Sequence, residues 1–405
     1  MATQMPIRLG IVGLGTALRQ MLPAFLKRDD LQIAAAASLS EDERAAFHRD
    51  FGVPVFNSLE ALLEHADVDA LYISTPTPLH AEHVCLAAAS GKHVLVEKPF
   101  ATTIEDAERM VEAVDRYRIQ LVVGHSHSFD PPIQAMRRWI VSGRLGAFRM
   151  AHNWCYNDWL YRPRLRDELN TELGGGVTFR QGAHQFDILR YLGGGLVGSV
   201  RAAIGRWDPA RPTEGAHVAF LEFVDGSAAT AVYNGYDHFH TTAFTFGLGE
   251  WGEASPAQET PAGASYYGQS RKRLRGLTAE AEQALKRTRS GYRERPRPPF
   301  LMPGQPCFGV TVVSCERGDL RQCPEGLVVY GEDTVGIETL SLDVSPHDQV
   351  VDEFCNAVQS GRPPLHSGRW AMATLEVCLA VLESGRTRRE VTLSRQIAVA
   401  DPVAE

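Results

Sequence analysis

The first 124 residues alternate short apolar runs with amphipathic stretches, and this alternation restricts the fold most. The apolar runs, which predict buried strands, are Ile7–Val12, Leu31–Ala37, Ala70–Ser74, Val94–Val96 and Leu121–Gly124. The stretches with helical spacing of apolar residues are Ala17–Leu26, Glu41–Phe51, Pro78–Ala89 and Ile104–Tyr117. Strands joined through helices pair in parallel by right-handed crossovers, so we expect an α/β domain with a doubly wound parallel sheet.

The pattern changes after about residue 130, where strands follow one another with short links. The predicted strands are Phe148–Cys155, Val197–Arg206, His217–Val224, Ala228–Tyr236, Ala243–Leu248, Phe308–Ser314, Leu327–Tyr330 and Val335–Leu340. The predicted helices are Ile133–Val141, Val177–Leu192, Asp348–Gln359 and Trp370–Ser384. Consecutive strands with turns favour a largely antiparallel, open sheet. We therefore expect two domains, 1–125 and an α+β domain 126–405 that ends in helices within 348–385.

Residues 250–305 have a different composition from the rest of the second domain. Gly, Pro, Ala and Glu dominate up to Gly268, followed by a basic helix candidate, Arg271–Arg289, and an Arg/Pro run, Arg293–Pro299. A loop of this length is uncommon inside a compact domain, so we interpret it as an insertion that carries its own helix. Its basic residues could bind anions, although the composition favours a solvated face or a subunit contact.

Charge and cysteine content exclude several classes of protein. The 405 residues carry a formal net charge of -8, which argues against a nucleic-acid or membrane-surface protein. The N-terminal residues lack the charged and apolar pattern of a secretory signal, and the apolar runs are too short to span a membrane. Seven scattered cysteines indicate reduced thiols in the cytoplasm. Cys315 and Cys323 have no histidine at metal-ligand spacing, so no metal site is expected.

A glycine-rich turn joins the first predicted strand to the first helix. Its residues are Gly13, Leu14, Gly15, Thr16 and Ala17. The first glycine permits a tight turn, the second lets the backbone approach a pyrophosphate, and the helix N-terminus supplies free N–H groups. The third fingerprint position holds Leu18 where Gly or Ala is usual. This context predicts a dinucleotide site.

The end of the second strand bears on the choice between NAD and NADP. An Asp or Glu is expected there if NAD binds, and the position holds Ser38, which suits either a ribose hydroxyl or a phosphate. Arg44 could hold a 2′-phosphate, but the acidic run Glu41–Glu43 would repel it. The sequence leaves both cofactors open and favours NAD.

Other strand ends carry polar residues that should meet at the ligand-binding edge of the parallel sheet. Thr75, Pro76 and His80 follow one strand, and Glu97, Lys98 and Pro99 follow another. Lys98 beside a carboxylate is either a functional cation or a solvated lysine in a turn. His125 and His127 follow the last strand, although His80 also fits a packing or capping role.

A second constellation lies at Gly174–Gly176 and the helix that it opens. Within Val177–Leu192, Arg180, His184 and Asp187 are spaced at i, i+4 and i+7, so they should share one helical face. The glycines suit close approach to a ligand, and Asp187 could orient His184.

In their order and spacing, these motifs resemble the Gfo/Idh/MocA family of nicotinamide-dependent oxidoreductases over nearly the whole chain. The resemblance implies an N-terminal Rossmann domain and a C-terminal α/β domain whose open sheet often mediates oligomerisation, here as a dimer or tetramer. Three segments, Gly124–Asp130, Tyr161–Arg164 and Trp207–Gly215, look most like phthalate 4,5-cis-dihydrodiol dehydrogenases.

The resemblance also implies residue roles. Lys98 would touch the nicotinamide ribose and the reacting hydroxyl, and His184 would act as general acid/base. Family members usually carry an aspartate four residues before this histidine, where this chain has Arg180. The remaining NAD or NADP contacts would come from the glycine turn together with Ser38, Thr75, Pro76, His80 and Glu97.

The substrate that the resemblance implies, a phthalate dihydrodiol, is a cyclic diol with ring carboxylates. Its negative charges require cationic side chains, and the guanidinium fork of arginine matches a carboxylate. The candidate cations are Arg180, Arg162 and Arg164, although a solvated loop is an alternative for the last two. The candidate hydrogen-bond partners are His125, His127, Tyr161, Asn157 and Asp187. Two other functions stay open: a dehydrogenase of sugars, inositol or other cyclic polyols, and a nucleotide-binding sensor without turnover.

Overall fold

The computed structural model describes residues 5–254, 268–287, Tyr292 and 304–400. The chain forms two compact units, and the described residues of the first are 5–126, Tyr292 and 345–372. The second unit comprises the described residues of 127–288 and 299–344, with 373–400. The chain therefore crosses between the units repeatedly, where the sequence predicts a single boundary after residue 125.

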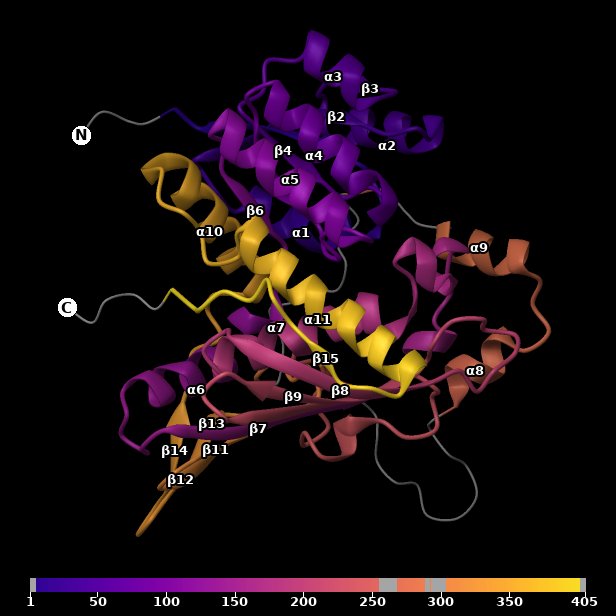
Figure 1. Cartoon of the computed structure of the whole chain (residues 1–405). Helices are drawn as coiled ribbons and strands as arrows, with labels where there is room; N and C mark the ends of the chain where they lie inside the picture. The colour runs from indigo at the N-terminus through magenta and orange to yellow at the C-terminus, as the bar shows by residue number, and fades with distance from the viewer. Residues whose placement is uncertain (1–4, 255–267, 288–291, 293–303, 401–405) are drawn as a thin grey trace. The chain divides into compact units, whose positions relative to one another are not determined.

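The first unit is built on a parallel sheet of six strands within the described residues (Figure 1). In spatial order the strands are β3 (Val55–Phe56), β2 (Leu31–Ala37), β1 (Ile7–Val12), β4 (Ala70–Ile73), β5 (His93–Val96) and β6 (Leu121–Val123). Every neighbouring pair is parallel, so the predicted doubly wound sheet is confirmed. The strand order reverses beside β1, which places the ends of β1 and β4 at the usual ligand crevice of such sheets.

Several helices of the first unit begin where the sequence supplies a capping side chain. They are α1 (Thr16–Leu26), α2 (Glu41–Phe51), α3 (Leu59–His65), α4 (His80–Ala89), α5 (Ile104–Tyr117), α10 (Pro346–Ser360) and the first residues of α11 (Gly368–Thr387). Ser40, Ser58 and Thr103 each accept a hydrogen bond from a backbone N–H of the first turn. Ion pairs of Lys27 with Asp348 and of Arg28 with Asp352 join α1 to α10.

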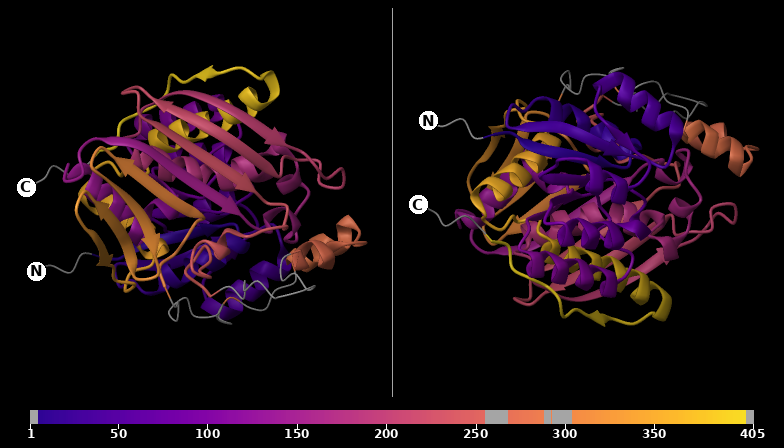
Figure 2. Two further views of the ribbon diagram at one scale, coloured as in Figure 1. Left: turned by 90° about the horizontal axis from the view of Figure 1, so that it is seen from below. Right: turned by 90° about the horizontal axis from the view of Figure 1, so that it is seen from above.

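The second unit contains a sheet of nine strands within the described residues, and Figure 2 shows these strands side by side. In spatial order they are β14 (Val335–Thr339), β13 (Gly326–Gly331), β12 (Gly318–Cys323), β11 (Val310–Cys315), β7 (Phe148–Tyr156), β10 (Ala228–Asn234), β9 (Ala216–Phe223), β8 (Val197–Gly205) and β15 (Val391–Thr392). All neighbouring pairs are antiparallel except β7 with β10, which confirms the predicted largely antiparallel sheet.

The predicted strand Ala243–Leu248 is wrong. A 3₁₀ turn, Thr241–Ala243, occupies its start, and Leu248 makes only an isolated bridge with Ala254. The hydroxyl of Thr245 donates to the carbonyl of Leu248 (2.6 Å), which closes a local turn in place of a ladder. Strand β12 is not predicted from the sequence, because its charged and amide residues hide the alternation of apolar side chains.

The helices of the second unit are α6 (Pro131–Val141), α7 (Ala183–Leu192), α8 (Gln269–Leu274), α9 (Ala279–Arg287) and the remainder of α11. The predicted helix Val177–Leu192 starts as a π-helical turn, Thr178–Gly182. The predicted basic helix Arg271–Arg289 is interrupted at Gly276, which has φ of 81°. The Arg/Pro run of the insertion lies outside the described residues. Among the short 3₁₀ helices, Thr77–Leu79 belongs to the first unit. Those of the second unit are His127–Phe129, Trp159–Tyr161, Asp167–Leu169, Thr171–Leu173 and Thr241–Ala243.

The nine-stranded sheet has one packed face and one exposed face. On the packed face, the Ser384 hydroxyl of α11 accepts from the N–H of Ala202 at 2.8 Å, and Gln185 of α7 donates to Asn153 of β7. The exposed face carries an apolar row in register across β8, β9, β10, β7 and β11. This row consists of Ala203, Val218, Val232, Trp154 and Val310. Trp154 is 47% exposed, which is unusual for so large an apolar side chain.

Candidate functional site

The glycine turn after β1 combines a tight crossing with an open helix end. A Cβ on Gly13, whose φ is 94°, would lie 2.8 Å from the backbone of Ser74, so only glycine fits where β1 passes β4. Gly15 is the N-cap of α1, and a Cβ added there would meet no described atom within 4 Å. Leu18 is fully buried on the inner side of the helix. The turn thus presents backbone N–H groups to an open space, which fits a dinucleotide pyrophosphate.

Ser38, at the end of β2, holds the carboxylate of Glu43 by a hydrogen bond. The Ser38 hydroxyl donates to Glu43 Oε2 at 2.6 Å, and Arg44 donates to the carbonyls of Ser38 and Leu39 at 2.8 and 2.9 Å. Arg44 is therefore engaged with the backbone. Glu43, in the first turn of α2, is thereby held beside the end of β2.

Lys98 follows β5 and Glu97 in the chain, and a hydrogen bond fixes the carboxylate of Glu97. The Tyr72 hydroxyl donates to Glu97 Oε1 at 2.7 Å, and the Lys98–Pro99 peptide bond is cis. Burial raises the pKa of Glu97, while the hydrogen bond from Tyr72 and the charge of Lys98 act in the opposite direction. A Cβ on Gly124 of the neighbouring strand end would lie 3.4 Å from Glu97 Oε1. Close packing therefore fixes the residue before Lys98.

His80 ties two strand ends together. Its Nε2 lies 2.9 Å from the carbonyl oxygen of Thr75, and its Nδ1 lies 3.0 Å from that of Pro99. The Thr75 hydroxyl lies 3.0 Å from Nδ1 of His83. Because Thr75 follows β4 and Pro99 follows Lys98, the buried His80 imidazole positions the segment that carries Lys98.

His125, after β6, is buried inside the first unit. Its ring centroid lies 6.2 Å from that of His366, whose Nδ1 is 2.8 Å from Glu353 Oε2. The structure therefore places His125 beside a second histidine from the C-terminal part of the chain, which the sequence pattern does not indicate.

In the second unit, His184 packs against a buried ionic cluster around His127. The ring centroids of the two histidines are 4.7 Å apart, and Phe308 contacts both rings. His127 Nδ1 lies 3.1 Å from Asp130 Oδ2, and its Nε2 lies 3.3 Å from Glu250 Oε1. Burial opposes charging of His127, but the two carboxylates outweigh it and raise its pKa to about 9. Both ring nitrogens of His127 are thus used within the protein, and its raised pKa favours the protonated imidazole, although burial raises the pKa of Asp130 as well.

The glycine run before α7 packs against protein. A Cβ on Gly175 would meet the carbonyl oxygen of Asp167, and one on Gly176 would meet the Glu214 carboxylate. Arg180 Nε donates to the carbonyl of Gly174 at 3.0 Å, and its Nη2 lies 3.8 Å from Asp167 Oδ2. The run therefore lets two backbone segments meet, and the guanidinium of Arg180 turns back toward them.

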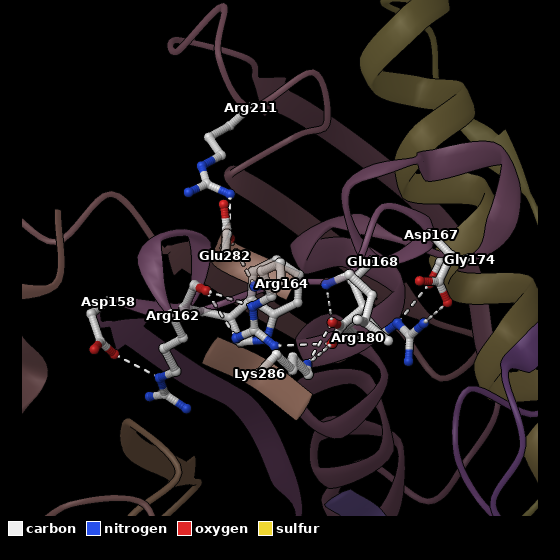
Figure 3. Close-up of polar contacts among 12 residues, drawn as sticks. Asp158, Arg162, Arg164, Asp167, Glu168, Gly174, Arg180, Arg211, Glu282 and Lys286 are labelled. Atoms are coloured by element: carbon white, nitrogen blue, oxygen red, sulfur yellow. Dashed lines mark hydrogen bonds and ion pairs between the residues drawn. The ribbon is translucent and has the colours of Figure 1, made fainter. Parts of the chain in front are cut away.

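Arg164 lies in a buried cluster with α9 of the insertion (Figure 3). Its guanidinium stacks on the Trp159 ring at 3.9 Å and donates to the Trp159 carbonyl and to Glu168. Lys286 donates to the same carboxylate at 2.6 Å. Burial opposes ionisation of Glu168, but Arg164, Lys286 and Arg180 outweigh it and lower its pKa to about 2. Glu282 of α9 adds a hydrogen bond to the N–H of Arg164 and an ion pair with Arg211.

Arg162 is the more accessible of the two loop arginines. Its Nε donates to Asp158 at 2.7 Å and its Nη1 lies 3.8 Å from Glu250, while 41% of the side chain stays exposed. The corresponding exposed fractions are 18% for Arg180 and 9% for Arg164. Arg162 also lines a pocket of about 290 Å³ whose wall includes Phe308, the ring that contacts His184.

The remaining candidates have partners within the second unit. The Tyr161 hydroxyl donates to Asp208 at 2.7 Å. Asn157 Oδ1 accepts from the N–H of Trp159 and from the hydroxyl of Tyr233, so its side chain shapes the loop beside the pocket. Asp187 is buried on α7, and its charge counteracts the burial that lowers the pKa of Arg190 to about 9.

Within the described part of the chain, no helix is long and apolar enough to cross a membrane. The same residues contain no group of three or more His, Cys, Asp or Glu side chains that could hold a metal ion.

Solved structures share this architecture. A crystal structure from Bordetella bronchiseptica RB50, described as that of a dehydrogenase, matches with a TM-score of 0.87 and 41% identity over 96% of this chain and 100% of that one. The WlbA dehydrogenase from Bordetella pertussis, in complex with NADH and UDP-GlcNAcA, matches with a TM-score of 0.70 and 21% identity over 96% and 99% of the two chains. The second likeness concerns the fold alone.

Sequence comparison gives the same result for both units. A curated relative from Comamonas testosteroni, 1-carboxy-3-chloro-3,4-dihydroxycyclohexa-1,5-diene dehydrogenase, is 39% identical over 384 residues, which cover 94% of this chain and 95% of the relative. Residues 7–125 match the Gfo/Idh/MocA oxidoreductase family with its NAD-binding Rossmann fold, and residues 133–247 match the Gfo/Idh/MocA C-terminal domain. The chain therefore belongs to the Gfo/Idh/MocA family of oxidoreductases.

Proposed function

We propose that this protein is a nicotinamide-dependent dehydrogenase that oxidises a carboxylated cyclohexadiene cis-diol, of the phthalate 4,5-cis-dihydrodiol type, to a catechol. The observation that carries the proposal is the 39% identity, over 94% of the chain, to a dehydrogenase of a carboxylated dihydroxycyclohexadiene. Such an oxidation needs a general base for the hydroxyl proton and a cation for the developing oxyanion, and His184 and Lys98 are the candidates for these roles.

Lys98 and His184 are proposed to act on one substrate hydroxyl. Bound nicotinamide supplies the hydride acceptor. His184 takes the hydroxyl proton as general base, and the Lys98 ammonium stabilises the developing oxyanion. The His127 ring packs edge-on against that of His184, with centroids 4.7 Å apart, and so helps to hold the imidazole in place. The resulting hydroxyketone tautomerises to the aromatic catechol: the proton of the remaining carbinol C–H leaves the ring carbon, and the ketone oxygen gains a proton.

We propose Arg162 as the principal partner of a substrate carboxylate, with Arg180 and Arg164 as secondary candidates. The greater exposed fraction of Arg162 and its place in the pocket wall support this ranking. His127 is better supported as a residue that positions His184. His125, Tyr161, Asn157 and Asp187 are better supported as structural residues of their own units, through His366, Asp208, Tyr233 and Arg190 respectively.

The proposed cofactor is NAD. Glu43, fixed by Ser38 at the end of β2, offers a carboxylate to ribose hydroxyls and repels a 2′-phosphate. The backbone contacts of Arg44 support the same choice, because they engage its guanidinium with the carbonyl oxygens of Ser38 and Leu39 in place of a 2′-phosphate.

We propose a homo-oligomer formed through the exposed face of the nine-stranded sheet. The apolar row from Ala203 to Val310 supports this proposal, because a continuous apolar stripe on an open sheet is costly to leave in water.

The seven cysteines are free thiols, which supports a reducing, cytoplasmic location.

The test is turnover with defined substrates. The purified protein is incubated with phthalate cis-4,5-dihydrodiol, or with a monocarboxylated cyclohexadiene cis-diol, and with NAD⁺ or NADP⁺, and the absorbance of the reduced nicotinamide is followed. We expect reduction with NAD⁺ and a catechol product. A panel of inositols and sugars serves as control: turnover of a polyol far above that of both diols, or no reduction with any diol, would overturn the proposal.

A further inference from the structure

Tyr292 is a described residue of the insertion that belongs to the first unit and lies on the glycine turn. It is only 5% exposed. Its hydroxyl donates to the carbonyl oxygen of Leu14 at 2.8 Å, and its N–H donates to Asp50 Oδ2 at 2.7 Å. Its ring packs edge-on against Phe47 with centroids 5.1 Å apart, and the Arg19 guanidinium lies 4.2 Å from the ring centre. These contacts connect the start of α1 with α2.

The hydrogen bond to Leu14 acts on the peptide group that faces a dinucleotide. In a planar trans peptide, the carbonyl of one residue and the N–H of the next point in opposite directions. Anchoring the Leu14 carbonyl on Tyr292 therefore directs the Gly15 N–H away from Tyr292. Gly15 caps α1 and borders the open space at its N-terminus, where this N–H is available to a phosphate oxygen.

A second connection runs from Tyr292 to the ribose side of the site. Burial and the nearby charge of Glu43 raise the pKa of Tyr292 to about 12, with Arg19 acting in the opposite direction. Glu43 is the carboxylate that Ser38 holds at the end of β2. Tyr292 is thus adjacent both to the pyrophosphate turn and to the acid proposed for the ribose.

We propose that Tyr292 is a cofactor-positioning residue, which holds the Leu14–Gly15 peptide in the orientation that binds the dinucleotide pyrophosphate. The insertion thereby completes the nucleotide site, a role that its basic composition does not indicate. The inference rests on the cofactor part of the proposed function and is independent of the diol.

The experiment compares Tyr292→Phe with wild type in the full-length protein. Calorimetric titration gives the Kd for NAD⁺ and for ADP-ribose, which contains the pyrophosphate and lacks the nicotinamide. We expect the Kd of both ligands to rise about fivefold, because one hydrogen bond contributes about 1 kcal/mol. With the diol as substrate, KM for NAD⁺ should rise by a similar factor while kcat and KM for the diol stay unchanged.

Two controls separate positioning from folding. Tyr117→Phe removes a hydroxyl from an exposed tyrosine at the end of α5 and should leave both Kd values unchanged. Thermal unfolding without ligand reports the stability of each variant. A Tyr292→Phe protein with wild-type Kd values for NAD⁺ and ADP-ribose overturns the inference, whatever its unfolding temperature. Wild-type protein that binds neither NAD⁺ nor NADP⁺ overturns the proposed function as well, whereas wild-type protein that binds NAD⁺ but oxidises no diol leaves this test fully informative.

Discussion

The two units handle their charged residues in opposite ways. In the first unit, the backbone delivers charge to the ends of parallel strands: Lys98 follows β5, and Glu43 is fixed beside the end of β2. In the second unit, loop arginines fold back into the protein, and Arg164 is buried against Glu168 and stacked on Trp159. A side chain at a strand end is accessible to a ligand because the sheet stops there. A cation in a loop is accessible only if no other part of the chain pairs with it or covers it. The following changes test that contrast.

Lys98→Met should have the largest effect. We expect turnover to fall by about 10³-fold, because the variant loses the cation that stabilises the oxyanion. The Kd for NAD⁺ should stay close to that of wild type, because the glycine turn and Glu43 are unchanged. Single-turnover kinetics and calorimetric titration measure the two quantities, and substantial turnover in the variant would make Lys98 an ordinary turn residue.

Arg164→Met should mainly destabilise the protein, because the Arg164 guanidinium is engaged with Glu168 and Trp159. Removing one partner leaves Glu168 buried with less compensation, at a cost of about 3 kcal/mol in the free energy of unfolding. Urea unfolding measures it. Arg166→Met is the matched control, because the Arg166–Glu280 pair is largely exposed and its removal should change stability little. A stable Arg164→Met protein with a raised KM for carboxylated diols would instead assign Arg164 to the substrate.

The buried His127 cluster should make the second unit sensitive to alkali. The pKa of His127 is about 9 in the folded protein and about 6.5 when unfolded, so its stabilising effect is complete below pH 6.5 and is lost as the pH rises through about 9. The stability difference between wild type and His127→Gln should shrink by up to about 3 kcal/mol across this range. Unfolding curves at pH 6, 7.5 and 9.5 measure the change, and a difference independent of pH would show that His127 is not charged.

Arg162→Met should have the smallest effect of these changes, and the effect should be confined to substrates that carry a carboxylate. We expect KM for a carboxylated cis-diol to rise about tenfold, since a hydrogen bond to a charged group contributes about 1.5 kcal/mol. A cis-diol without a carboxylate is the control and should show equal KM values with both proteins. Equal KM values for the carboxylated diol would move carboxylate recognition away from this pocket.

The sequence predicts the first unit better than the second for a physical reason. Buried parallel strands are continuous apolar runs, so β1, β4 and β5 can be located, and with them the residues at their ends. Arg162 and Arg164 give no such signal, because their environment depends on Asp158, Glu250 and on Glu282 of the insertion, up to 118 residues away. Tyr292 shows the same limit: nothing in its neighbouring residues indicates Leu14 as its partner. Its place follows only from the three-dimensional fold.

The repeated crossing of the chain between its units limits how the protein can be divided. A fragment that ended at Ser126 would contain the complete parallel sheet, yet it would lack α10, whose Asp348 pairs with Lys27 at 2.7 Å, and it would lack Tyr292. The nucleotide-binding half of this chain is therefore not a transferable module. Recombination or truncation that treats residue 126 as a domain border would remove part of the half that it aims to keep.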